Sequence, residues 1–158
     1  MINWKNPVIE SSTMFTQVKI AKEAFSEGAY RYAYQGYDKR LNQDLVIKCM
    51  KEIDFDEYNV KTMSKDLELV AICNLVVEQF NERVIDFVAK PNLLRDFVRP
   101  FIFETIGNLK KDGIDQKYFY AENYIEGEYV KQNNNGGWMS NSCSDEALIA
   151  QALSHFSW

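Results

Sequence analysis

The sequence predicts an α+β fold with about five antiparallel strands, one long helix and a shorter final helix. Three observations predict it: strand-like segments separated by turns up to about residue 50, a long run of apolar residues spaced three and four apart, and two more strand-like segments beyond it. Because domains mostly run to roughly 100–200 residues, the 158 residues are predicted to form one domain.

The N-terminal part of the chain is predicted to form an antiparallel meander. The mixed segment 17–24 leads into a turn at 25–29, and aromatic residues then alternate along 30–37, as on a strand with one covered face. The polar segment 38–44 supplies the next turn, and the apolar segment 45–50 is the third strand. Short connections favour antiparallel pairing of these consecutive strands.

The middle of the chain is predicted to form one helix from about 59 to 87. Acidic side chains are interspersed with the apolar ones, which suits a helix with one face on a sheet and the other in water. The helix should end before Pro91, because a proline disfavours helical geometry in the residue before it. The apolar positions with helical spacing are Val60, Met63, Leu67, Val70 or Ala71, and Val77.

The last third of the chain is predicted to add two strands and a helix. The strands cover 99–106 and 117–124, and Asp112-Gly113 between them is the signal of a tight turn. The Asn- and Gly-rich segment 133–137 is a loop. Either Ser144 or Asp145 can cap the final helix, which is expected to end near Ser157.

Composition and charge exclude several classes of protein. The net charge of −5 argues against a general nucleic-acid surface, which needs clustered Lys and Arg. No apolar run approaches the ~20 residues that cross a bilayer, and the N-terminus has no signal-peptide pattern, so we expect a soluble, cytoplasmic protein without membrane partners. Cys49, Cys73 and Cys143 are too widely spaced for a disulfide framework or a thiolate zinc site, and we interpret them as buried or idle thiols.

The turn around Gly28 is the first candidate for a functional role. It is followed by Arg31, whose guanidinium could neutralise a polyphosphate while the backbone amides of the turn donate hydrogen bonds to it. An ordinary hairpin turn explains the same residues. No Gly-Lys-Ser/Thr follows, so the segment is not a Walker A motif.

Lys48 is the second candidate, because it lies within an otherwise apolar strand. Its ammonium must either meet an anionic group or reach water, since an isolated buried charge costs several kcal/mol. Asp66 or Glu68 on the long helix would be the natural partner. The alternative is a lysine on the open face of an edge strand, with its stem over apolar surface and its head in water.

The third candidate is the acidic segment 119–131, where a strand runs into an extended connector. Free backbone N–H and C=O groups in such a connector could pair with the edge of an adenine. An exposed acidic loop without a ligand is the competing interpretation.

These segments together resemble the alpha-kinase family of atypical serine/threonine protein kinases. The similarity extends from about Met14 to Trp158. The residues that carry it are Gly28-Ala29-Tyr30-Arg31, Val46-Ile47-Lys48, Tyr124-Ile125-Glu126-Gly127, Tyr129-Val130-Lys131, Asn133-Asn134-Asn135-Gly136 and Ala152-Leu153-Ser154-His155-Phe156.

The resemblance implies a kinase-like N-lobe over about 14–121, followed over 122–158 by a hinge and the first helix of a C-lobe. It implies an enzyme that transfers the γ-phosphoryl group of ATP to a protein serine or threonine. Lys48 would contact the ATP phosphates, and the Gly28 turn with Arg31 would reach toward them. The residues that would complete the nucleotide site are Asp66 on the helix and the hinge positions Glu122 and Ile125.

The sequence also departs from the family pattern. It lacks the Asp-x-Gln-Gly segment that supplies the catalytic aspartate and Mg²⁺ ligands, the His/Cys cluster that binds zinc, and the late glycine-rich loop. Gln132 stands where the family more often has tyrosine. The only histidine, His155, fits a structural helix position better than a general base. We therefore expect a truncated C-lobe and little or no activity from this polypeptide alone.

Two further interpretations follow from these departures. The chain could be a non-catalytic pseudokinase or interaction module that binds a nucleotide or a protein, or a fragment of a longer kinase. A lobe without its partner should expose apolar side chains of the final helix and self-associate through them. These side chains are Leu148, Leu153, Phe156 and Trp158.

Overall fold

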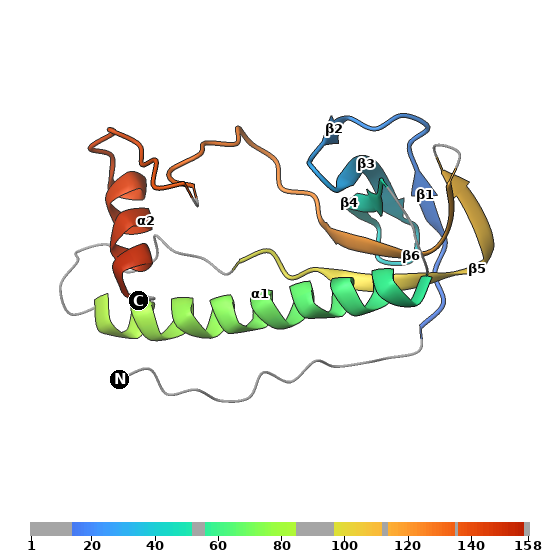
Figure 1. Ribbon diagram of the computed structural model, residues 1–158, viewed down its shortest axis with the longest axis horizontal. Helices are drawn as coiled ribbons and strands as arrows, with labels where there is room; N and C mark the ends of the chain where they lie inside the picture. The colour runs from blue at the N-terminus through green and yellow to red at the C-terminus, as the bar shows by residue number, and fades with distance from the viewer. Residues whose placement is uncertain (1–13, 52–55, 85–96, 112–113, 135, 157–158) are drawn as a thin grey trace. The chain divides into compact units, whose positions relative to one another are not determined.

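The computed structural model describes residues 14–51, 56–84, 97–111, 114–134 and 136–156 (Figure 1). They form two compact units. The sheet unit takes in described residues within 14–71 and 98–125, and the helical unit takes in those within 72–97 and 126–156. The predicted α+β class is confirmed, with a sheet and two helices in the described residues. The predicted lobe boundary at residue 121 stays a prediction.

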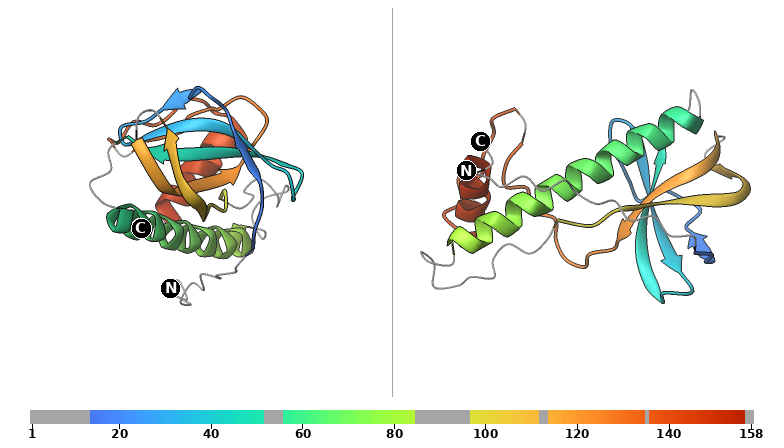
Figure 2. Two further views of the ribbon diagram at one scale, coloured as in Figure 1. Left: turned by 90° about the vertical axis from the view of Figure 1, so that its right-hand side faces the viewer. Right: turned by 90° about the horizontal axis from the view of Figure 1, so that it is seen from below.

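The sheet is antiparallel throughout, and its strands run in the order β1-β3-β4-β6-β5, with β2 also pairing with β3. The strands of this unit form a strongly curved sheet (Figure 2). The meander predicted for the N-terminal strands is confirmed, but the two later strands join in reversed order, so that β6 lies beside β4. The bounds are β1 (Val18–Ile20), β2 (Ser26–Glu27), β3 (Arg31–Asp38), β4 (Gln43–Met50), β5 (Phe101–Lys111) and β6 (Ile114–Asn123).

The prediction for 17–29 is only partly right. The strand predicted over 17–24 is limited to β1, and residues within the predicted turn form β2, which pairs with β3. The physical reason is that the segment between β1 and β2 leaves the strand geometry while its two ends stay on the edge of β3. At these ends, the amides of Ala21 and Phe25 donate to carbonyl groups of β3. The turn itself lies further along, where the Gly28 amide donates to the Arg31 carbonyl at 2.8 Å.

The helices agree with the sequence prediction in type and place. α1 (Asp56–Val84) begins slightly before the predicted start, and its predicted end near 87 and Pro91 lie outside the described residues. α2 (Asp145–Phe156) begins after Ser144, whose Oγ accepts a hydrogen bond from the Ala147 amide at 3.3 Å, so Ser144 is the cap. The predicted turn at Asp112-Gly113 also lies outside the described residues.

One face of the sheet forms the hydrophobic core, because alternate residues of each strand point to the same side. The buried residues of this cluster are Tyr34, Leu45, Ile47, Cys49, Phe119 and Ala121, each at most 1% exposed. Gly36 lies among them, and a Cβ atom there would lie 2.5 Å from Cγ1 of Ile47. The core therefore excludes any side chain at position 36 unless Ile47 moves.

The helical unit has its own small apolar cluster. The rings of Phe80 and Phe156 meet edge to face with 5.5 Å between centroids, and the Arg83 guanidinium carbon lies 5.3 Å from the Phe156 ring. Of the apolar side chains expected to be exposed, Phe156 is only partly exposed, because α1 supplies its neighbours. Leu148 is 52% exposed, and Trp158 lies outside the described residues.

The predicted loop at 133–137 is confirmed in its described residues. Asn134 Oδ1 accepts hydrogen bonds from the amides of Gly136 and Trp138, at 2.8 and 3.0 Å, so one side chain holds the turn. Asn133 donates through Nδ2 to Ser154 Oγ of α2 at 2.9 Å. As for membranes, neither described helix has the length and apolar character of a bilayer span.

Candidate functional site

The candidate site lies on the sheet face opposite the core, within the sheet unit. Leu45, Ile47 and Cys49 of β4 point into the core, so Lys48 points to the other face. In the β4–β6 pairing, Lys48 lies opposite Tyr120, and Glu122 follows two residues later on the same face of β6. Strand pairing alone therefore brings these three side chains together.

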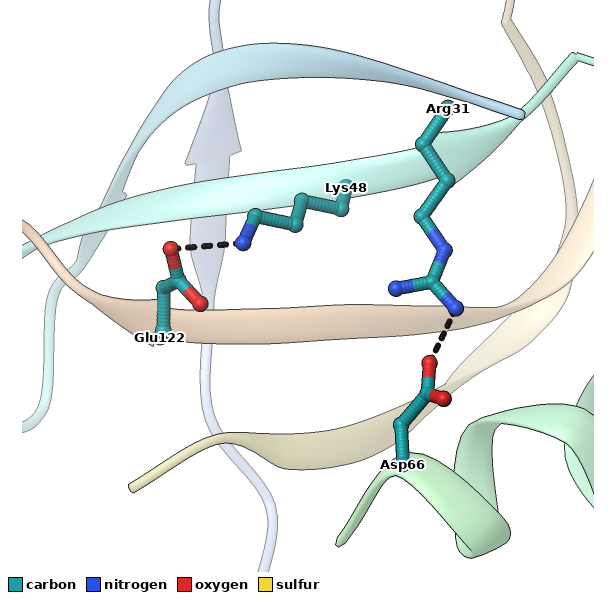
Figure 3. A network of polar contacts seen from close by, with 4 residues as sticks. All are labelled: Arg31, Lys48, Asp66 and Glu122. Atoms are coloured by element: carbon teal, nitrogen blue, oxygen red, sulfur yellow. Dashed lines mark hydrogen bonds and ion pairs between the residues drawn. The ribbon is translucent and has the colours of Figure 1, made fainter. Parts of the chain in front are cut away.

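Lys48 forms an ion pair with Glu122, with its Nζ atom 2.7 Å from Oε1 (Figure 3). The two side chains are 29% and 20% exposed, so the pair is partly shielded from water. Because β4 lies between β3 and β6, the edge-strand interpretation of Lys48 is wrong. The expected helix partner is also wrong: Glu122 lies diagonally across one strand pair and is reached without leaving the sheet.

Arg31, at the start of β3, pairs instead with Asp66 of α1 (Figure 3). Their side chains are 24% and 31% exposed. Glu68, the other acidic residue considered for Lys48, is exposed on the same helix. The acidic side chain of the helix thus neutralises the arginine of the turn, and the acidic side chain of the strand neutralises the lysine.

Tyr120 lies beside both cations. Its ring centroid is 5.0 Å from the Arg31 guanidinium carbon and 5.5 Å from Lys48 Nζ, both within the range of cation–π attraction. The residue is 5% exposed. Burial, followed by the charges of Glu122 and Asp66, raises the pKa of its hydroxyl to about 12, so the phenol is neutral at physiological pH.

The sequence analysis missed Tyr120 as a site residue. The sequence did contain an indication of it. Tyr120 precedes Glu122 by two residues, so the two side chains lie on the same face of the strand. The register between β4 and β6 could not be predicted from the sequence. Only the pairing of Lys48 with Tyr120 across these strands shows that the ring lies beside the lysine.

The remaining predicted site residues lie next to this cluster along the chain. Gly28 begins the turn that ends at Arg31, and the nearest atom to a Cβ built there is 3.9 Å away, so the protein itself leaves room for a side chain. The turn is tied to the end of β4 by Lys51, whose Nζ lies 2.7 Å from Glu27 Oε2. Ile125 follows β6 and is 66% exposed.

The described residues do not fit a resident metal. No group of three or more His, Cys, Asp and Glu side chains among them has the arrangement of a metal site. Asp66 and Glu122 are each paired with a cation rather than turned toward one another as ligands. No magnesium or zinc chemistry is therefore assigned to these residues.

The site is suited to exchange one anion for another. Two cations, Arg31 and Lys48, lie beside one aromatic ring, and each is balanced by a single carboxylate. A guanidinium can donate two parallel hydrogen bonds to a phosphate, and an ammonium binds phosphate as a compact charge. A polyphosphate chain could therefore bind here by taking the place of the carboxylates.

Known proteins similar to this chain are kinases. Alpha-protein kinase vwkA of Dictyostelium discoideum is 30% identical over 142 residues, which cover 89% of this chain and 21% of that protein. Myosin heavy chain kinase B of the same organism is 28% identical, covering 90% of this chain and 18% of its own length. Eukaryotic elongation factor 2 kinase of Rattus norvegicus is 27% identical, covering 89% and 18%.

The chain thus spans about a fifth of the length of these relatives. The model of the Alpha-kinase family matches residues 26–158, which include the Gly28 turn, both ion pairs and Tyr120. A match over most of the sequence shows the family, and the chain belongs to the alpha-kinase family.

Proposed function

We propose that this chain is the ATP-binding part of a serine/threonine protein kinase and binds the nucleotide on the sheet face that carries Lys48. The observation that supports this most is the placement of two cations, Arg31 and Lys48, beside Tyr120. The family provides the second support, since the similar proteins are named as kinases of proteins. The reaction is transfer of the γ-phosphoryl group of ATP to a hydroxyl of a protein serine or threonine in the cytoplasm.

Each site residue has a separate role in this proposal. Lys48 and Arg31 bind the phosphates after Glu122 and Asp66 release them, and backbone amides of the Gly28 turn add hydrogen bonds. The main chain from Glu122 to Ile125 pairs with the edge of the adenine. The Tyr124 amide is not among the pairing groups, because it donates to the Asp44 carbonyl of β4 at 3.0 Å.

We further propose that the 158-residue polypeptide binds ATP but transfers phosphate slowly. Phosphoryl transfer depends on positioned metal ions and a residue that orients the attacking hydroxyl. The Asp-x-Gln-Gly segment that serves this purpose in the family does not occur in the sequence. Mg²⁺ and structural zinc would be bound by residues of a longer kinase.

Calorimetry with ATP tests the proposal. We expect binding at millimolar ATP or below, and we expect Lys48→Ala to weaken it by about 10-fold or more, the value of a lost charge-assisted hydrogen bond. Lys117→Ala is the matched control, because Lys117 is on β6 and pairs with Glu104 at 2.8 Å, outside the Lys48 cluster. No ATP binding by the wild-type chain would overturn the nucleotide proposal and leave the interaction module.

A radiolabelled phosphoryl-transfer assay tests the expected inactivity of this polypeptide. ATP binding without turnover by the chain fits a pseudokinase or a fragment of a longer kinase. Turnover at a rate typical of protein kinases, 1–100 per second in order of magnitude, would contradict the expected inactivity of this polypeptide.

A further inference from the structure

We propose that Tyr120 is a positioning residue for phosphate binding: its ring keeps both Arg31 and Lys48 beside it when their carboxylate partners are displaced. This inference rests on the proposed ATP site. It assigns a role to a residue that the sequence analysis did not select, and it concerns the cations that would contact the phosphates rather than the adenine.

The first step of the argument is the position of the ring. Tyr120 is opposite Lys48 in the β4–β6 register, and its centroid is 5.0 Å from the Arg31 guanidinium carbon and 5.5 Å from Lys48 Nζ. Arg31 comes from β3 and Lys48 from β4. The ring is therefore a contact shared by two cations from two different strands.

The second step concerns what remains when an anion arrives. In the structure Arg31 is paired with Asp66 and Lys48 with Glu122. A phosphate chain competes with both carboxylates for the same N–H groups, so these pairs cannot orient the cations in the complex. The aromatic face attracts cations without using those N–H groups, so Tyr120 can retain both while the N–H groups bind phosphate.

The third step is that the ring remains uncharged under working conditions. A phenolate beside a polyphosphate would repel it. Burial and the neighbouring carboxylates of Glu122 and Asp66 raise the pKa of the Tyr120 hydroxyl to about 12, which keeps the phenol neutral. The ring can therefore attract the cations without adding an anion to the site.

A series of fluorinated residues at position 120 tests this role. Fluorine withdraws electrons from the ring face and weakens cation–π attraction while the shape changes little. Starting from Tyr120→Phe, mono-, di- and trifluorinated phenylalanine are introduced at position 120. Affinities for ATP and for inorganic tripolyphosphate, which has no adenine, are measured by calorimetry, and each variant's melting temperature is recorded.

We expect affinity for both ligands to fall stepwise with fluorination, by about 3- to 10-fold over the series, the scale of a cation–π attraction. The melting temperature should change little, because fluorination hardly alters the shape of the packed ring. A ring that only fills space would show no trend in affinity. The same series at Tyr118 is the matched control: that ring is on the same face of β6 and lies 5.2 Å from Lys117 Nζ. Tyr118 should show no trend in affinity.

The outcomes separate this inference from the proposed function. If the wild-type chain binds neither ATP nor tripolyphosphate, the ATP site itself is wrong. If the wild-type chain binds ATP and Lys48→Ala weakens that binding, but fluorination at position 120 leaves the affinity unchanged, the ATP site stands and the role of Tyr120 is overturned. An affinity loss that follows the melting temperature instead of the degree of fluorination also overturns it.

Discussion

Lys48 Nζ lies 2.7 Å from Oε1 of Glu122, so the lysine proposed to contact the ATP phosphates is already neutralised by a carboxylate of the neighbouring strand. Arg31 is likewise paired with Asp66. The free site therefore has balanced charges, and an incoming polyphosphate has to compete with two internal anions.

The first prediction concerns this competition at Lys48. Glu122→Gln removes the competing charge without changing the main chain proposed to pair with adenine. We expect ATP affinity, measured by calorimetry, to rise by about 1.5- to 5-fold, in line with a partly exposed ion pair. Glu104→Gln, which disrupts the pair with Lys117 elsewhere on the sheet, should leave the affinity unchanged. A weaker affinity for Glu122→Gln would mean that the Glu122 side chain aids nucleotide binding.

The second prediction concerns the link between β3 and α1. Asp66→Asn removes the charge that pairs with Arg31 and should lower the free energy of unfolding by about 0.2–1 kcal/mol, because both side chains are partly exposed. The measurement is urea denaturation. Glu68→Gln, on the exposed side of the same helix, should have a smaller effect, and equal effects would contradict the structural role of the pair.

The third prediction concerns glycine in the core. Gly36→Ala places a Cβ atom 2.5 Å from Cγ1 of Ile47, so it should destabilise the fold by about 1–3 kcal/mol in a denaturation experiment. Gly28→Ala is the matched control, because the nearest atom to its new Cβ is 3.9 Å away. If Gly28→Ala keeps full stability but weakens ATP binding, the backbone of that turn approaches the nucleotide.

The fourth prediction is a pH dependence of stability from Asp38, which is 2% exposed. Burial raises the pKa of its carboxyl, but hydrogen bonds from the Thr16 hydroxyl and the amides of Leu41 and Arg40 outweigh burial and lower the pKa below 3.8. The charged form is therefore favoured by folding. Its contribution is present above pH 3.8 and is lost as the pH falls through the lowered pKa.

Comparison with Asp38→Asn isolates that contribution. The wild-type chain should be more stable by about 1 kcal/mol at neutral pH, because a carboxylate accepts stronger hydrogen bonds than an amide. The difference should shrink in acid. A difference that stays constant down to the acid transition would contradict the assignment to the Asp38 charge.

Much of the fold could be predicted because its signals are local. Alternation identified β3, a short apolar run identified β4, and regular spacing identified α1, since each pattern follows from the geometry of one element. The break between β1 and β2 was missed because it depends on hydrogen bonds to the edge of β3, which belong to a different part of the chain.

The residues of the candidate site were predicted from the sequence, but the ion pairs between them were not. Arg31, Lys48, Asp66 and Glu122 were all selected from sequence, yet the partner of Lys48 was expected on the helix, whereas it lies on the adjacent strand. Which carboxylate meets which cation depends on strand order and register, and neither is encoded locally. The same reason explains why Tyr120 was overlooked.

The position of β6 between β4 and β5 has a consequence for biosynthesis. As the nascent chain leaves the ribosome, Lys48 emerges before Glu122 and Tyr120, which follow only after α1 and β5. The lysine is consequently synthesised well before the strand that neutralises it. Until that strand inserts, one edge of β4 is open to pairing with other extended chains, so aggregation through this edge is most favoured in that interval.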